Sequence, residues 1–203
     1  AGGAGVAALA AVNASIQRQA SEPDDSALGG AAQFFEWKHG NVFYKTAGLE
    51  HQRPPLIFVH GIGAGISSFM WRKNFHLLAR DFPVYALDLL GFGFSDKPAT
   101  APYSAELYVE LITAFIRQVT GYPANAITSS LGAAYVVRVA DEQPELIGTI
   151  VLNSPAGAGS FRTRPGMAGA AFYGLLQSPV LGTSFYNVMA SERSIREYAS
   201  KHF

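Results

Sequence analysis

Short apolar runs alternate with longer amphipathic segments between residues 56 and 152. The apolar runs are 56–59, 84–87, 124–128 and 147–152. The segments in which apolar residues recur at helical spacing are 67–80, 104–120 and 131–142. Mostly apolar runs are typical of strands buried on both faces, and their alternation with helices is typical of a parallel sheet. The sequence therefore predicts an α/β fold, in which helices cover both faces of a parallel sheet.

Two regions flank this alternation. Residues 34–38 and 42–45 predict a β-hairpin around the turn at His39-Gly40-Asn41. From Gly157 onward the stretches GMAGAAFYGLLQ, TSFYNVMA and SIREYASKHF predict short helices. The chain is thus expected to comprise an N-terminal apolar segment and linker (1–33), an α/β core (34–156) and the start of a helical lid (157–203).

The N-terminal residues 1–12, AGGAGVAALAAV, are small and apolar and include no charge. They are too few to cross a bilayer, which needs about 20 residues. Two interpretations stay open for residues 1–14: the remainder of an export signal or membrane anchor, or a short Ala-rich helix. The first makes membrane association or export an expectation. Residues 15–32 are polar and contain Pro and Gly-Gly, which predicts a linker.

Charge and cysteine content exclude several classes of function. Fifteen basic residues balance fifteen acidic ones, so the chain lacks the basic excess of a nucleic-acid-binding surface. The chain contains no cysteine, which excludes disulfides and thiolate metal sites. Nothing in the sequence predicts a metal or an organic cofactor. Hydrophobic residues make up 49% of the chain, as expected of a folded globular protein.

The stretch TSSLG, residues 128–132, stands between a predicted strand and a predicted helix. A nucleophile elbow needs small residues two places before and two places after its serine, because the turn is tight. Thr128 and Gly132 hold these places around Ser130, whereas Ser129 would be flanked by the bulky Ile127 and Leu131. Ser130 is therefore the candidate nucleophile. The alternative is a serine that only caps the following helix.

A second loop, His60-Gly61-Ile62-Gly63-Ala64-Gly65, follows the apolar run 56–59. Together with the elbow it predicts an oxyanion hole, formed by the N–H groups of Ile62 and Leu131. Each donor of this kind stabilises a transition state by about 3–4 kcal/mol. The alternatives are a simple Gly-rich turn or a phosphate loop. The loop lacks the lysine of a Walker motif and the GxGxxG spacing of a dinucleotide site.

Three stretches carry a family resemblance: FVHGIGAGISSFMW, YALDLLGFGFSDKP and TSSLGAAYVVRVADEQPE. Over residues 34–160 the chain resembles the α/β-hydrolase superfamily, in particular lid-bearing members related to esterases, lipases and epoxide or haloalkane hydrolases. The resemblance implies that Ser130 is the nucleophile and that Ile62 and Leu131 are the oxyanion donors. It also implies that the loop after the run 84–87 has a mainly structural role. The site-shaping positions that it implies are His60, Gly61, Thr128 and Gly132, and the loop residues are Asp88, Gly91, Gly93 and Ser95. A serine at the elbow, where haloalkane and epoxide hydrolases place an aspartate, resembles the ester-cleaving branch.

The same resemblance implies an acid and a histidine after the nucleophile. The only histidine downstream of Ser130 is His202, on a charged helical stretch, and Asn153-Ser154-Pro155 offers no carboxylate. The final strands, the acid and the histidine of the fold are therefore expected to be missing from these residues. Three explanations stay open: part of a longer hydrolase, one piece of a split enzyme completed by a second chain, or a non-catalytic descendant.

The expected function is hydrolysis of a carboxylic ester, or a related acyl bond, through an acyl-enzyme on Ser130. The lid stretch suggests a hydrophobic small-molecule substrate, because its predicted helices are rich in large apolar residues. These residues are Met167, Phe172, Tyr173, Leu175, Leu176, Phe185 and Tyr186. The alternative is a non-catalytic binding or assembly subunit, membrane-associated through its N-terminus.

Overall fold

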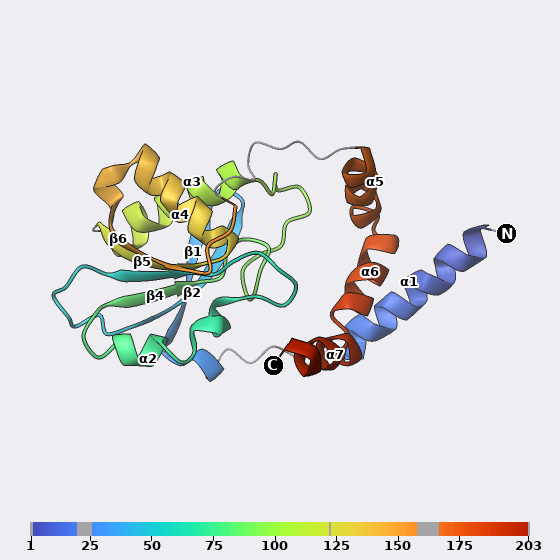
Figure 1. Ribbon diagram of the computed structural model, residues 1–203, viewed down its shortest axis with the longest axis horizontal. Coiled ribbons are helices and arrows are strands. Elements are labelled where there is room, and N and C mark those ends of the chain that lie inside the picture. Colours follow the sequence, from blue (N-terminus) through green and yellow to red (C-terminus); the bar gives the residue numbers. More distant parts are fainter. Residues whose placement is uncertain (1, 20–25, 122, 158–166, 203) are drawn as a thin grey trace. The chain divides into compact units, whose positions relative to one another are not determined.

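The computed structural model describes residues 2–19, 26–121, 123–157 and 167–202. The chain forms two compact units, one spanning Pro23–Phe161 and the other combining Ala1–Glu22 with Arg162–Phe203. The first unit holds a six-stranded sheet (Figure 1). The second consists of helices.

The sheet has the strand order β1-β2-β4-β3-β5-β6. Its strands are β1 (Ala31–Trp37), β2 (Gly40–Ala47), β3 (Leu56–Val59), β4 (Val84–Leu87), β5 (Ala124–Ser129) and β6 (Ile147–Asn153). β4, β3, β5 and β6 run parallel to one another, which confirms the predicted parallel sheet. The hairpin β1–β2 is added antiparallel to β4. The described sheet thus has β1 at one edge and β6 at the other.

The hairpin is longer than predicted. Gly40 adopts a φ of 136°, which suits the tight turn after Trp37, and β1 begins at Ala31 rather than Phe34. Residues 31–33 are exposed and not strongly apolar, so side-chain pattern gives no strand signal there. Their backbone nevertheless pairs with Tyr44, Lys45 and Thr46. Backbone pairing with β2 therefore extends the strand.

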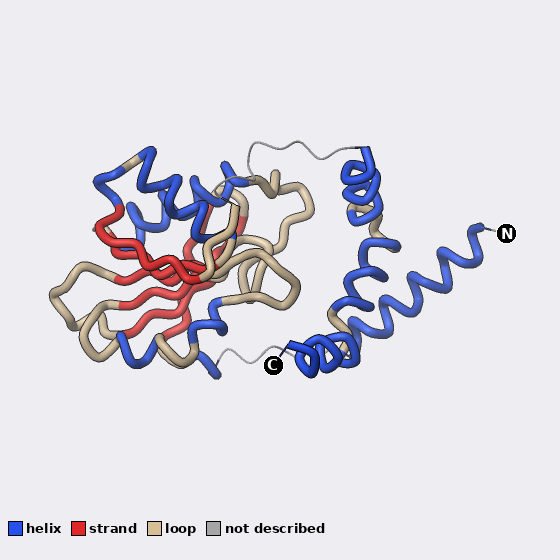
Figure 2. Tube along the Cα trace, viewed as in Figure 1, coloured by secondary structure: helices blue, strands red, loops and turns tan. Residues whose placement is uncertain are grey.

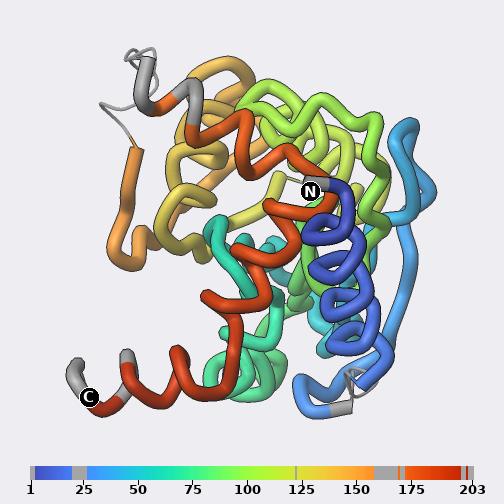
Figure 3. Tube along the Cα trace, turned by 90° about the vertical axis from the view of Figure 1, so that its right-hand side faces the viewer, coloured from blue at the N-terminus to red at the C-terminus, as the bar shows by residue number. Residues whose placement is uncertain are grey.

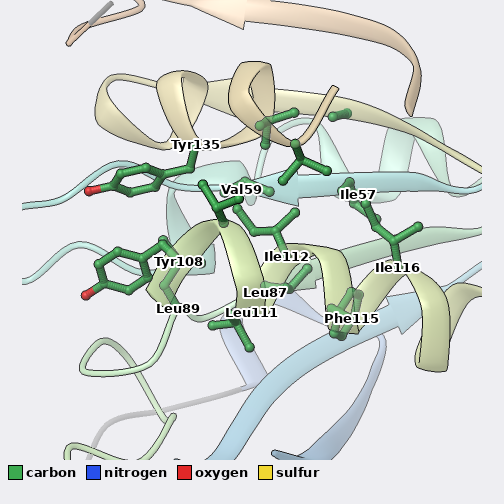
Figure 4. Packing of buried hydrophobic residues seen from close by; sticks show 14 of the residues in the cluster. Ile57, Val59, Leu87, Leu89, Tyr108, Leu111, Ile112, Phe115, Ile116 and Tyr135 are labelled. Atoms are coloured by element: carbon green, nitrogen blue, oxygen red, sulfur yellow. The ribbon is translucent and has the colours of Figure 1, made fainter. Parts of the chain in front are cut away.

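Alternate residues of the central strands pack on opposite faces of the sheet, as the pleat requires. Ile57 and Val59 of β3 belong to the larger core cluster, while Leu56 and Phe58 belong to the smaller one. The helices α3 (Ala105–Phe115) and α4 (Leu131–Glu142) cover the larger cluster, as Figure 4 shows for the α3 residues. The opposite face is covered by η2 (Ser68–Trp71) and α2 (Phe75–Leu78). Helices therefore cover both faces, as predicted (Figure 2).

Two predicted helices differ in detail. The expected helix 67–80 is wrong as a continuous element, because it divides into the 3₁₀ turn η2 and the single turn α2. Between the two elements the backbone makes i→i+3 bonds, from the Arg72 N–H to the Phe69 carbonyl and from the Asn74 N–H to the Trp71 carbonyl, instead of a continuous run of i→i+4 bonds. The expected helix 104–120 is α3 capped by Ser104, followed by a π-helical turn, η3 (Ile116–Thr120). The helical stretch ends at Gly121, which adopts a φ of 65°. The short 3₁₀ turns η1 (Ser26–Leu28) and η4 (Pro144–Leu146) complete this unit.

The helical unit consists of α1 (Gly2–Gln19), α5 (Met167–Leu176), α6 (Leu181–Met189) and α7 (Glu192–His202), and Figure 3 shows α1 beside α6. The three short helices predicted at the C-terminal end are present. The expected linker 15–32 is wrong for residues 15–19, because α1 continues to Gln19. Residues 20–25 of that linker lie outside the described residues. Among the described helices, none combines the length and apolarity that a membrane crossing requires.

A buried asparagine holds α1 against α6. The Asn13 side chain donates to the Val180 carbonyl (3.1 Å) and accepts from the Asn187 amide (3.0 Å). It also exchanges hydrogen bonds with the Ser184 hydroxyl. Asn13 is 7% exposed, so these bonds satisfy an amide that would otherwise be costly to bury. The polar residue near the end of the apolar segment therefore serves to join two helices.

Candidate active site

The site is formed where β3 and β5 end. Val59 pairs with Thr128, so the loops that follow the two strands leave the sheet side by side. Gly61 lies directly against the serine, because a Cβ atom at residue 61 would be 2.8 Å from the Ser130 Cβ and 3.4 Å from its Oγ. The structure thus brings together two loops that the sequence separates by about 70 residues. A larger residue at position 61 would displace the serine side chain.

Ser130 has a strained backbone. Its φ of 51° and ψ of −128° lie outside the regions that L-residues commonly occupy. The turn is held by the Ser130 N–H, which donates to the Asn153 carbonyl (3.2 Å), and by the Ser130 carbonyl. That carbonyl accepts from the N–H groups of Ala133 and Ala156, each at 3.1 Å. Such strain typically costs about 1–3 kcal/mol and persists at functional sites. This conformation is the one that a nucleophile elbow requires.

The two positions that lie two residues before and after Ser130 differ in the size of side chain that they accept. A Cβ atom at Gly132 would overlap the backbone carbonyl of His60, so only glycine fits where α4 begins. Thr128 is fully buried beneath the turn, and its hydroxyl has no hydrogen-bond partner among the described residues. The glycine position is therefore fixed by the backbone of the other loop. The threonine position accepts a larger side chain at the cost of one unpaired hydroxyl.

The predicted oxyanion donors lie on the same two loops. Ile62 follows Gly61 on the first loop, and Leu131 is the first residue of α4. Within the described residues, neither the Ile62 N–H nor the Leu131 N–H has a hydrogen-bond partner. Ile62 follows Gly61, which lies against Ser130, and Leu131 follows Ser130 itself. Backbone donors of this kind are what a negative oxygen on an attacked carbonyl requires, and the oxyanion hole stays a prediction.

His60 is buried and both of its ring nitrogens bond to the backbone. The Leu89 N–H donates to Nε2 (3.0 Å), so the ring proton is on Nδ1, which donates to the Gly61 carbonyl (2.6 Å). Burial lowers the pKa of His60, and the hydrogen bond to the Gly61 carbonyl and the nearby Asp88 carboxylate only partly offset this. The ring is therefore neutral, and it joins the loop after β3 to Leu89, which follows β4. It has no free nitrogen with which to take a proton from Ser130.

This buried imidazole makes the stability depend on pH. Its pKa is lower in the folded protein than the ordinary 6.5, so below pH 6.5 the unfolded chain binds a proton that the folded protein does not. Stability is then lost as the pH falls, by up to about 1.4 kcal/mol per pH unit. Urea unfolding at pH 7.5, 6.5 and 5.5 measures the slope. His60→Asn should flatten it relative to the parent, and an equal slope in both proteins would contradict the assignment.

The loop after β4 is organised by Asp88. One carboxylate oxygen accepts from the Ser68 N–H (2.6 Å) and the other from the Phe94 N–H (2.8 Å). The Ser95 hydroxyl accepts from the Phe43 N–H (2.8 Å) and donates to the Asp88 carbonyl. Gly93 adopts a φ of 48°, and a side chain there would overlap the Asp88 carboxylate. These bonds use both Asp88 oxygens, as expected of a structural residue.

No described side chain forms a hydrogen bond with the Ser130 hydroxyl. The other described histidines contact residues outside the elbow: His39 meets Trp37 edge to face, and His76 packs against Phe75. His51 lies beside the Glu50 carboxylate. His202 falls within α7, but its side chain lies outside what the structure describes. The described residues contain no cluster of three His, Cys, Asp or Glu that could hold a metal.

A cavity of about 570 Å³ lies beside the oxyanion loop. Its lining comes from four separate segments of the chain. These residues are Ile62, Gly91, Phe92, Tyr103, Ser104, Ala105, Tyr108 and Tyr135. No sequence pattern predicts the cavity, because Tyr108 falls at the helical spacing of an amphipathic segment, which indicates a core position. The one available signal was the density of aromatic residues near the loop 88–96 and the start of α3.

Comparison with known proteins gives consistent matches. A family model described as alpha/beta hydrolase fold matches residues 54–188. A 2-hydroxymuconate semialdehyde hydrolase of Pseudomonas sp. (strain CF600) is 32% identical over 104 residues, which cover 51% of this chain and 37% of that protein. A protein of Rattus norvegicus named 1-acylglycerol-3-phosphate O-acyltransferase ABHD5 is 31% identical over 119 residues, covering 57% and 32%. The chain thus spans about a third of the length of these curated relatives.

Solved structures show the same fold. A serine hydrolase involved in carbazole degradation has a TM-score of 0.59 and 26% identity, covering 84% of this chain and 67% of its own. A thioesterase domain from the curacin biosynthetic pathway has a TM-score of 0.62 and 23% identity, covering 73% and 53%. A bacterial membrane phospholipase A has a TM-score of 0.61 and 20% identity, covering 98% and 71%.

Proposed function

The chain belongs to the α/β hydrolase fold family, and from this premise we propose that it is a serine hydrolase with Ser130 as its nucleophile. The proposed reaction is cleavage of a carboxylic ester or a related acyl bond through an acyl-enzyme. The observation that carries it is the strained Ser130 backbone, which lies against Gly61 and is accompanied by the unpaired N–H groups of Ile62 and Leu131.

The reaction follows from these positions. The Ser130 Oγ attacks the ester carbonyl carbon while a base takes the hydroxyl proton, and the negative oxygen binds the two N–H groups. Collapse of this intermediate breaks the bond to the alcohol, which leaves with a proton from the base. Water then attacks the acyl-enzyme in the same way, releasing the acid and restoring the serine. No metal or organic cofactor enters any of these steps.

The base and its acid must come from outside the described residues. We place their source at the free edge of β6, because in the described sheet this strand pairs only with β5. Val151 and Leu152 of β6 are 53% and 46% exposed, although they are apolar strand residues. An unpaired apolar edge is a template for further strands. Either a continuation of this chain or a second chain would supply strands there, together with the histidine and the carboxylate.

A hydrophobic substrate is supported by the helical unit. Several of its large apolar side chains are exposed, and an apolar surface of this kind can bind an apolar ligand. These are Phe172, Tyr173, Leu175, Leu176, Phe185 and Tyr186. The side chain of Met167 lies outside the described residues. A small-molecule ester with an apolar acyl or alcohol group is therefore the proposed substrate class.

The acyl-enzyme is tested by a pre-steady-state burst. The complete natural chain is mixed with a 4-nitrophenyl ester, and release of 4-nitrophenolate is followed in the first turnover. The proposal predicts a burst close to one equivalent per Ser130, followed by slower steady turnover. If turnover occurs without a burst, the reaction is quenched with acid during steady turnover to trap any acyl-enzyme directly. Turnover without any trapped acyl-enzyme would overturn the acyl-enzyme, and absence of all turnover would overturn the proposal as a whole.

A second candidate is a non-catalytic binding subunit, associated with a membrane through α1. Its support is the exposure of four apolar α1 side chains, Val6, Leu9, Val12 and Ile16. Such a subunit would keep its native role after Ser130→Ala, and the complete chain would sediment with liposomes through α1. Loss of the role in Ser130→Ala would exclude this candidate.

A further inference from the structure

The cavity beside Ile62 has the size and the lining of a small-molecule site. Its volume of about 570 Å³ lies within the range of about 300–1,000 Å³ that ligand pockets usually occupy. Four aromatic side chains line it: Phe92, Tyr103, Tyr108 and Tyr135. No charged residue belongs to the lining among the described residues. Aromatic faces without charge favour a planar, uncharged group.

Tyr108 and Tyr135 form a stacked pair in the cavity wall. Their ring centroids are 5.1 Å apart at an interplanar angle of 24°, and Figure 4 shows the two hydroxyls directed the same way. Burial raises the pKa of Tyr135 to about 12, so its hydroxyl stays neutral. The Tyr108 hydroxyl donates to the Leu90 carbonyl (3.2 Å). Because its proton is used in this bond, the Tyr108 hydroxyl can only accept a hydrogen bond from a ligand, and the ring is held in place.

Tyr103 forms a second wall, supported by a glycine. A Cβ atom at Gly91 would lie 2.8 Å from the Tyr103 Cε1, so the absence of a side chain lets the ring lie against the loop backbone. The Tyr103 hydroxyl has no hydrogen-bond partner among the described residues. The neighbouring Ser104 hydroxyl accepts from the Leu107 N–H at the start of α3 (3.3 Å). Tyr103 is therefore the wall residue that a substitution can remove with the least effect on the buried core.

Ile62 connects the cavity to the proposed chemistry. Its side chain lines the cavity, and its N–H is one of the two proposed oxyanion donors. We propose that this cavity binds a planar aryl group of the ester substrate, while the ester carbonyl lies at the Ile62 and Leu131 N–H groups. Tyr103 is a specificity-determining residue of this aryl pocket. The inference rests on the proposed function, because it assumes an ester bound at Ser130.

Matched substrates test the aryl pocket. The pairs are methyl 3-phenylpropanoate with methyl 3-cyclohexylpropanoate, and benzyl acetate with cyclohexylmethyl acetate, each normalised to its rate of alkaline hydrolysis. They differ in planarity at nearly equal size, on the acyl side and the alcohol side respectively. The complete natural chain should prefer the aryl member of at least one pair by about 3- to 10-fold in kcat/KM, as aromatic contacts of this kind imply.

The variants separate a binding role from a structural one. Tyr103→Ala should lower kcat/KM more for the aryl ester than for the cyclohexyl ester, mainly through KM, so that the aryl preference falls about threefold. Tyr103→Phe keeps the ring and should keep the preference. Equal turnover of aryl and cyclohexyl esters in both pairs, or an unchanged preference in Tyr103→Ala, would overturn the inference. In either case the acyl-enzyme burst would persist, whereas its absence together with all turnover would overturn the proposed function itself.

Discussion

Replacing Ser130 with alanine is expected to reduce ester hydrolysis by the complete natural chain by a factor on the order of 10⁶ in kcat. The substitution removes the Oγ that forms the acyl-enzyme, while the proposed oxyanion donors Ile62 and Leu131 stay in place. Substrate binding should therefore change little, so that KM stays within a few-fold of the parent value. Steady-state kinetics on a short-chain 4-nitrophenyl ester measure both parameters.

Ser129 provides the matched control. It is the neighbouring serine, it lies at the end of β5, and it is 7% exposed. Ser129→Ala should keep most of the activity, because the turn directs only Ser130 into the positive-φ conformation. A large loss in Ser129→Ala with full activity in Ser130→Ala would reverse the assignment. Full activity in both variants would place the nucleophile elsewhere.

Substitution of Gly132 by alanine is expected to destabilise the fold by at least about 3 kcal/mol, although alanine is normally the better helix residue. In an exposed helix the change from glycine to alanine adds about 1 kcal/mol of stability. At Gly132 the new methyl group would overlap the backbone carbonyl of His60, which cannot rotate away as a flexible side chain can. Overpacking of this kind typically costs about 1–3 kcal/mol, and more where only backbone could yield. Chemical denaturation of the two proteins gives the difference.

Gly174, within α5, is the matched control for this prediction. No atom lies within 4 Å of the position that its Cβ would occupy, so Gly174→Ala should be neutral or mildly stabilising. The two substitutions are chemically identical and both fall in helices. If Gly132→Ala were as stable as the parent, the close approach of the two loops would be contradicted. The same variant should also lose activity, because the elbow would have to move.

The parallel part of the fold could be predicted because its signals are local. The runs 56–59 and 84–87 coincide with β3 and β4. A short run of consecutive apolar residues is typical of a strand that is buried on both faces of a parallel sheet. The helix expected at 67–80 is interrupted between Trp71 and Phe75, and apolar spacing alone does not distinguish one continuous helix from two short turns. The Ser68 N–H bonds to Asp88, a residue 20 positions away, and no periodicity within the segment can reveal that bond.

In the candidate site, too, local features could be predicted and features that depend on distant contacts could not. Small residues around Ser130 are visible in the sequence, and they indicate a tight turn there. The neutral state of His60 is not visible, because it depends on the Leu89 N–H, which comes from another strand end. The aryl pocket is assembled from four segments whose meeting depends on how α3 and α4 pack. Local sequence patterns therefore predict helices, strands and turns, whereas the pocket and the state of His60 depend on contacts between loops that are distant in the sequence.

The central claim, that Ser130 is a nucleophile, is tested most directly by covalent labelling and peptide mapping. The complete natural chain is treated with a fluorophosphonate, digested, and analysed by mass spectrometry. The account predicts one equivalent of adduct on the peptide that contains Ser130, prevented by a competing ester and absent in Ser130→Ala. An unlabelled Ser130 in a complete chain that turns over esters, or an adduct confined to another residue, would contradict it.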